Sequence, residues 1–300
     1  MWQDTKSKQN DVITFPGFLY REFRSKHDYH LFGTQMTGVT SVLQSAGNSG
    51  GLMTWYGNLG AAAAFNTGTP GGWHEAYDTV VKKYGKLNTQ AAYELDALFP
   101  QFKEARLAAI RTRDGAADVG KAAHKACEEF ELGRKDFSHL EEKVFKRFEP
   151  YTKWYAQNVE KTLFVERPVF SKSMFVGGTP DGGFVTRDGK SLINDKKFKE
   201  SIGSPHPHWQ MACYRAMIEE MAQDTETPVR LELADGTIEE YASPQEYLGS
   251  IGAVKWDGSV ILLVDPTCEV RPIYRYAYEQ DLAAFRAALL IYREEGAFEK

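Results

Sequence analysis

The spacing of apolar residues predicts a largely helical first half and a mixed second half of the chain. About 35 residues without a clear period are followed by two helical pieces, over 38–47 and 51–66, with a Gly/Ser/Asn cluster between them. From Glu75 to Phe148 apolar residues recur every three or four positions, as on amphipathic helices. Residues 164–198 are instead rich in β-branched, aromatic and glycine residues, which is typical of strands.

The remaining chain continues this alternation. An amphipathic helix is expected over 208–222, strands over 229–233, 259–265 and 270–278, and a final helix over 279–296. The order of helices, strands, helix, strands and helix predicts an α/β fold with a mixed sheet rather than a repeated βαβ array.

Charge and cysteine content narrow the class of protein. Against 36 Lys and Arg stand 41 Asp and Glu, a net charge of −5, which excludes a protein that coats nucleic acid by bulk electrostatics. Three cysteines without a CxxC pair exclude a four-thiolate zinc or iron–sulfur site built from one chain. No signal peptide or membrane span is recognisable, so a cytoplasmic protein without a membrane partner is expected.

A predicted hairpin carries the most informative residues. The loop Arg187–Gly189 has glycine at its third position, a favoured hairpin connection. With this three-residue loop Asp181 lies opposite Asp195, and Lys197 shares their face because side chains alternate along a strand. A two-residue loop would put the two aspartates on opposite faces, so the site depends on the loop length.

Two carboxylates and an ammonium group at one end of a hairpin suit a divalent-metal site. Paired carboxylates repel each other unless a cation lies between them, and such oxygen-rich sites bind Mg²⁺ or Mn²⁺ together with a phosphate. A lysine there can orient a water or neutralise charge on the phosphate, which points to phosphodiester hydrolysis. The alternative is a polar hairpin with capping aspartates and solvated Lys196, Lys197 and Lys199.

The motifs of this region resemble those of a nuclease superfamily. Pro180–Asp181 and, fourteen residues after this aspartate, Asp195–Lys197 resemble the PD-(D/E)xK signature. Gln210 and Tyr214 resemble the QxxxY helix motif of its RecB-like exonuclease branch, which includes phage recombination, CRISPR-adaptation and mitochondrial genome-maintenance exonucleases. Residues 120–124 resemble the GxxxH helix motif of the same branch, whose histidine binds the metal.

The resemblance implies a role for each residue of the site. Mg²⁺ or Mn²⁺ would be held by His124, Asp181, Asp195 and the backbone carbonyl of Lys196, with Glu128 or Glu166 as further candidates. The implied catalytic set is Asp181, Asp195, Lys197, Gln210 and Tyr214. Taken singly, His124 also fits a core or surface histidine, Tyr214 a buried tyrosine, Glu128 a solvated acid and Glu166 an ion-pair partner on the sheet.

The resemblance also implies the fold: a restriction-endonuclease-like core, with a central mixed β-sheet flanked by helices, over residues 115–300. Residues 1–114 would form a mainly helical N-terminal region that caps access to strand ends. The chain departs from the family at Phe198, where Thr or Ser is common, and lacks the cysteines of the iron–sulfur subset, so no iron–sulfur cluster is expected.

The function implied is a metal-dependent DNA exonuclease acting on ends or single-stranded tails in recombination, repair or phage DNA processing. A single-strand annealing or recombination protein is a candidate partner. Candidate nucleic-acid contacts are Arg113, Lys121, Lys199 and Trp55, which also fit ordinary surface cations and a core tryptophan. The alternatives are a structure-specific endonuclease or resolvase on the same core, and a catalytically silent nucleic-acid-binding module.

Overall fold

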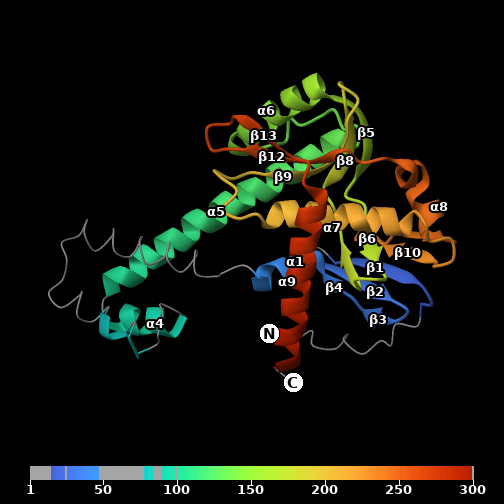
Figure 1. Ribbon diagram of the computed structural model, residues 1–300. Coiled ribbons are helices and arrows are strands. Elements are labelled where there is room, and N and C mark those ends of the chain that lie inside the picture. Colours follow the sequence, from blue (N-terminus) through green and yellow to red (C-terminus); the bar gives the residue numbers. More distant parts are fainter. Residues whose placement is uncertain are drawn as a thin grey trace. The chain divides into compact units, whose positions relative to one another are not determined.

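The computed structural model describes residues 15–23, 26–46, 78–80, 82–83, 89–98 and 100–298 (Figure 1). The chain divides into a larger unit, Met1–Ala46 with Ala123–Lys300, and a smaller one, Gly47–Ala122. The predicted boundary lies between residues 114 and 115. In the structure the smaller unit ends at Ala122 instead, and the first described strands belong to the larger unit.

A five-stranded mixed sheet forms the centre of the larger unit, in the order β13-β12-β9-β8-β5. Its strands are β5 (Val159–Val165), β8 (Gly182–Thr186), β9 (Ser191–Lys197), β12 (Gly258–Val264) and β13 (Val270–Arg275). β9 and β12 run parallel, and the other neighbours are antiparallel. Strand β12 is a nearly continuous apolar run because both of its faces are buried. The predicted mixed α/β class is confirmed.

Helices cover both faces of this sheet. The end of α5 (Pro100–Glu131) and α6 (Glu142–Asn158) share one apolar cluster with Phe184 and Leu262. Helix α7 (His206–Met221) and α9 (Tyr278–Phe298) share another with Ile193 and Ile261. In Figure 1, α7 lies between the central sheet and strands β1 and β2. This enclosure buries four consecutive residues, 211–214, so α7 is more buried than the expected amphipathic helix.

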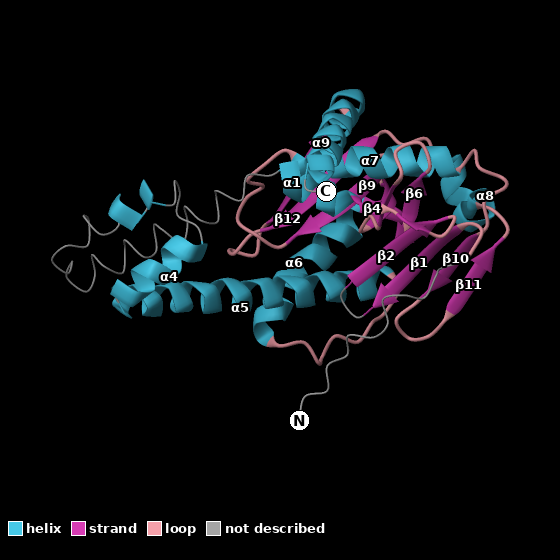
Figure 2. Ribbon diagram, turned by 90° about the horizontal axis from the view of Figure 1, so that it is seen from below, coloured by secondary structure: helices cyan, strands magenta, loops and turns pink. Residues whose placement is uncertain are grey.

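A second sheet begins within residues 1–114, in a stretch for which the sequence showed no clear period. Strands β1 (Phe18–Phe23), β2 (Lys26–Leu31) and β3 (Thr34–Gln35) join β10 (Val229–Glu232) and β11 (Ile238–Tyr241) in the order β11-β10-β1-β2-β3. Figure 2 shows β2, β1, β10 and β11 side by side. The pairing of β1 with β10 joins segments far apart in the chain, which local periodicity does not reveal.

A third sheet has three strands. It consists of β4 (Thr37–Gly38), β7 (Val176–Gly178) and β6 (Val169–Ser171), in the order β4-β7-β6. The other described helices are α1 (Val39–Ala46), α4 (Thr89–Leu98), α8 (Pro244–Leu248) and a 3-10 turn at Gly249–Ala253. The predicted helical piece over 51–66 lies outside the described residues. Within the described chain, no helix combines the length and apolarity needed to cross a membrane.

Candidate metal centre

The β8–β9 hairpin has the predicted register. Gly182 pairs with Asn194 and Val185 with Ser191, so Asp181, just before β8, lies opposite Asp195. Gly189 closes the three-residue loop with φ of +84°, a conformation that glycine adopts without steric cost. The hairpin therefore has the three-residue loop on which the predicted site depends.

Asp181 connects the hairpin to helix α5. One of its carboxylate oxygens, Oδ2, lies 2.8 Å from Nε2 of His124 and accepts a hydrogen bond of 2.7 Å from the backbone N–H of Lys196. Glu166, just after β5, places Oε1 3.8 Å from the same histidine nitrogen. His124, Glu166 and Asp181 each offer a ligand atom, and these three atoms lie within 4.8 Å of one another.

Two carboxylate oxygens at this centre are buried without a hydrogen-bond partner: Oδ2 of Asp195 and Oε1 of Glu166. The other oxygen of Asp195 lies 2.6 Å from Nζ of Lys197. Buried acceptors normally have a donor, and a cation satisfies an oxygen that lacks one. Glu166 also has a left-handed backbone, with φ of +45°, which is uncommon for a residue other than glycine and recurs at functional sites. The imidazole and the two carboxylates of His124, Glu166 and Asp181 fit a divalent cation, and Asp195 lines the same cavity without being part of this three-residue group.

Burial and neighbouring charges shift the pKa values of the carboxyl groups at this centre. Burial raises the pKa of Asp195 to about 6 and that of Glu166 to about 9, and the charge of Asp181 adds to both shifts. Burial also acts on Asp181, but His124 and the neighbouring lysines outweigh it and hold the pKa of Asp181 below its usual range. A divalent cation would supply positive charge at this point and favour the ionised form of all three carboxyl groups.

An open cavity of about 830 Å³ gives access to these groups. Seven of the predicted residues line it: His124, Glu166, Asp181, Asp195, Lys197, Gln210 and Tyr214. The Gln210 amide donates to the Tyr214 hydroxyl at 2.8 Å. A Cβ on Gly178 would lie 2.5 Å from a ring carbon of Tyr214, so glycine is needed there for the tyrosine to pack.

The rest of the cavity lining comes from residues that the sequence analysis did not single out. It is formed by strands β2, β4 and β7 and the start of α1: His27, Tyr29, Gly38, Val39, Thr40, Ser41, Gly177 and Thr179. Among these residues, the hydroxyl groups of Tyr29 and Thr179 form a hydrogen bond of 2.9 Å with each other. Strand β7 and helix α1 lie in segments predicted as strand and helix, but β2 and β4 were not predicted, and no sequence signal placed any of them beside the hairpin.

Several predicted residues are not brought to the cavity. Glu128 pairs with Lys125 at 2.7 Å, so of the two acidic candidates only Glu166 joins the cluster. Lys199 is exposed and is not among the lining residues, and Lys121 is an exposed residue of the smaller unit. Trp55 and the Arg113 side chain lie outside the described part of the chain. The role of the Lys196 backbone carbonyl as a metal ligand stays a prediction.

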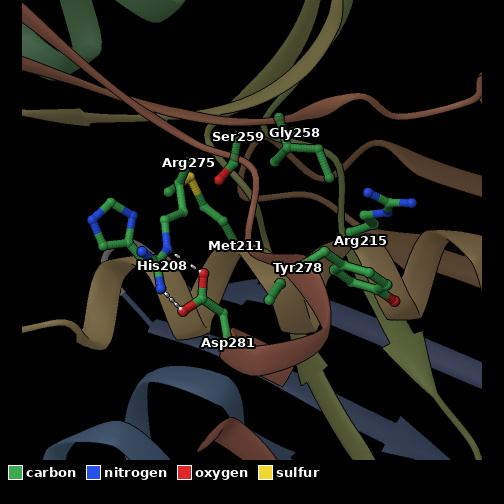
Figure 3. A pocket seen from close by; sticks show the side chains of 10 residues that line it. His208, Met211, Arg215, Gly258, Ser259, Arg275, Tyr278 and Asp281 are labelled. Carbon is green, nitrogen blue, oxygen red and sulfur yellow. Dashed lines mark hydrogen bonds and ion pairs between the residues drawn. The ribbon is translucent and has the colours of Figure 1, made fainter. Parts of the chain in front are cut away.

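A smaller pocket also borders α7 (Figure 3). His208 lines it, whereas Gln210 and Tyr214 do not. In it Arg275 makes two hydrogen bonds to Asp281, at 2.7 and 2.8 Å. Arg215 is held by Glu219 at 2.7 Å and stacks on a tyrosine ring. Both arginines that line this pocket are already paired with carboxylates, so they offer a phosphate no free cation.

Replacing His124 by alanine is expected to weaken Mn²⁺ binding at least about tenfold, because the change removes one of the grouped ligand atoms. The dissociation constant is measured from the electron paramagnetic resonance signal of free Mn²⁺. His139→Ala is the matched control, since His139 is exposed in the loop between α5 and α6. Equal Mn²⁺ affinity in both variants would contradict the assignment of His124.

No protein-family model matches the chain, and no curated protein matches it either. The geometry of the centre and the motifs that form it therefore carry what can be inferred about function.

Proposed function

We propose that the chain is a metal-dependent nuclease with a restriction-endonuclease-like core, acting as a DNA exonuclease. One observation carries the proposal: the histidine of a helix, an acidic residue after β5, both aspartates and the lysine of one hairpin, and the Gln/Tyr pair of the next helix line a single cavity. The resemblance to the PD-(D/E)xK signature predicts this grouping from residues spread over about 90 positions.

In this proposal His124, Glu166, Asp181 and Asp195 would hold Mg²⁺ or Mn²⁺. When bound, the ion would neutralise phosphate charge and acidify a water. The Lys197 ammonium lies 2.6 Å from Oδ1 of Asp195 and lines the cavity, where it would donate to the attacking water or to a phosphate oxygen as negative charge builds up. Gln210 and Tyr214 would contact the nucleotide next to the cleaved bond.

The proposal of DNA ends as substrate, and of work in recombination, repair or phage DNA processing beside an annealing protein, follows the RecB-like resemblance. A time course tests it with end-labelled linear DNA and RNA, single- and double-stranded, and with covalently closed circular DNA, under Mg²⁺, Mn²⁺ or EDTA. We expect linear DNA to be degraded from its ends with either ion, no cleavage in EDTA, and intact circles.

Asp195→Asn should abolish this cleavage, because an amide does not supply the carboxylate charge that a cation needs. Asp188→Asn is the matched control, since Asp188 is exposed at the other end of the same hairpin and should leave the rate unchanged. Cleavage of circles would assign an endonuclease or resolvase instead. DNA binding without cleavage would assign a silent binding module, and full activity of Asp195→Asn would overturn the site.

A further inference from the structure

A buried ion pair lies on the face of β9 opposite to Asp195. Nζ of Lys196 is 3.0 and 3.1 Å from the two carboxylate oxygens of Glu131, and the exposed fractions of the two side chains are 0% and 1%. The hydroxyl of Tyr151 donates to the same carboxylate. Taking two charges out of water is costly, and apolar side chains of similar size are often as stable in such places. Stability alone therefore does not account for this pair.

Lys196 is also bonded to the metal centre through its backbone. Its N–H donates to Oδ2 of Asp181 at 2.7 Å, and that oxygen lies 2.8 Å from Nε2 of His124. Its ammonium group lies 3.4 Å from the backbone carbonyl oxygen of Asp181. One residue thus contacts both the side chain and the backbone of a candidate ligand, and its ammonium group also binds Glu131.

Helix geometry closes this network into a ring. Glu131 follows His124 by seven residues in α5, which is two turns, so both side chains lie on the same face about 10 Å apart along the axis. The Glu131–Lys196 pair therefore fixes α5 against the strand that carries Asp195, and with it the position of His124 against Asp181. Apolar contacts allow a helix to shift along a sheet, whereas a shift that separates a buried ion pair leaves a charge without its partner and is strongly unfavourable.

We propose that Lys196 and Glu131 are positioning residues of the metal centre, which hold His124 and Asp181 at the separation that binds a divalent cation. The proposal rests on the metal centre of the proposed function, and it does not depend on whether DNA is the substrate. Its ligand is a divalent cation, with Mn²⁺ as the probe.

The test replaces the charged pair by a neutral one, Lys196→Met with Glu131→Gln, which keeps an acceptor for the Tyr151 hydroxyl. We expect the double variant to melt within a few degrees of the wild type by circular dichroism, and its Mn²⁺ dissociation constant to rise at least about tenfold, as for other residues that orient metal ligands. The control is Lys172→Met with Asp224→Asn, an ion pair of 2.8 Å in the same unit that does not line the cavity. Its Mn²⁺ affinity should be unchanged.

Wild-type Mn²⁺ affinity in the folded double variant would overturn the proposal, as would absence of Mn²⁺ binding by the wild type. If the double variant does not fold, Tyr151→Phe serves as the second test, because it keeps both charges and removes only the hydroxyl that orients Glu131. We then expect Mn²⁺ affinity to fall about threefold, because only part of the stabilisation from one hydrogen bond to a charged group is transmitted from Glu131 to the metal ligands, and an unchanged value would contradict the proposal. A wild type that binds Mn²⁺ but does not cut DNA would refute the nuclease function alone.

Discussion

Lys197→Ala is expected to slow DNA cleavage by about 10²–10⁴-fold while Mn²⁺ binding is retained or becomes tighter. The ammonium group lies on the cavity, 2.6 Å from Oδ1 of Asp195, and is itself unable to bind a cation. Its loss removes a donor for the water or the phosphate, but it also removes a positive charge beside a ligand. Rates from single-turnover assays and Mn²⁺ dissociation constants are measured on the same preparation.

Lys190→Ala is the matched control for this substitution. Lys190 is exposed at the tip of the same hairpin, where it pairs with Asp188 at 3.1 Å, and its removal should change neither quantity. If Lys197→Ala lost Mn²⁺ affinity and rate in equal proportion, the lysine would serve to hold Asp195 in place rather than act on the substrate. Undiminished cleavage would remove Lys197 from the catalytic set.

The hairpin was predictable from sequence because its determinants are local. A glycine at the third loop position sets the loop length, and the alternation of side chains then fixes which residues share a face with Asp195. The helix residues Gln210 and Tyr214 were equally accessible, since residues four apart lie on one face of any helix. The local signals did not show whether the hairpin and the helix lie close together. In the structure, residues from both line one cavity.

The missed features depend on contacts between distant segments. Strand β1 is consecutively buried at Phe18, Leu19 and Tyr20, so it lacks the alternation of a strand with one exposed face, and its parallel partner β10 begins at Val229. Glu131 reads in sequence as one more acid at the end of a charged helix. Only the approach of α5 to β9 makes it the partner of a buried lysine.

Lys196→Met alone is expected to lower the free energy of unfolding by about 3–5 kcal/mol near neutral pH, because it leaves the buried Glu131 without its cation. The added change Glu131→Gln should restore most of this loss. Urea titrations measure both variants. The control is Lys153→Met, which breaks an exposed pair with Glu149 and should cost no more than about 1 kcal/mol.

The loss in Lys196→Met should also depend on pH, with a sign that follows from Glu131. Burial raises the pKa of this carboxyl, and Lys196 provides the largest opposing effect, so the substitution raises the pKa further above the unfolded value of 4.5. A carboxyl with a raised folded-state pKa destabilises the fold above the unfolded pKa, since unfolding then allows it to ionise. The difference from the wild type should therefore be largest near pH 7 and shrink as the pH falls toward 4.5. An equal difference at both pH values would mean that lost packing of the lysine stem, rather than the unpaired carboxylate, sets the cost.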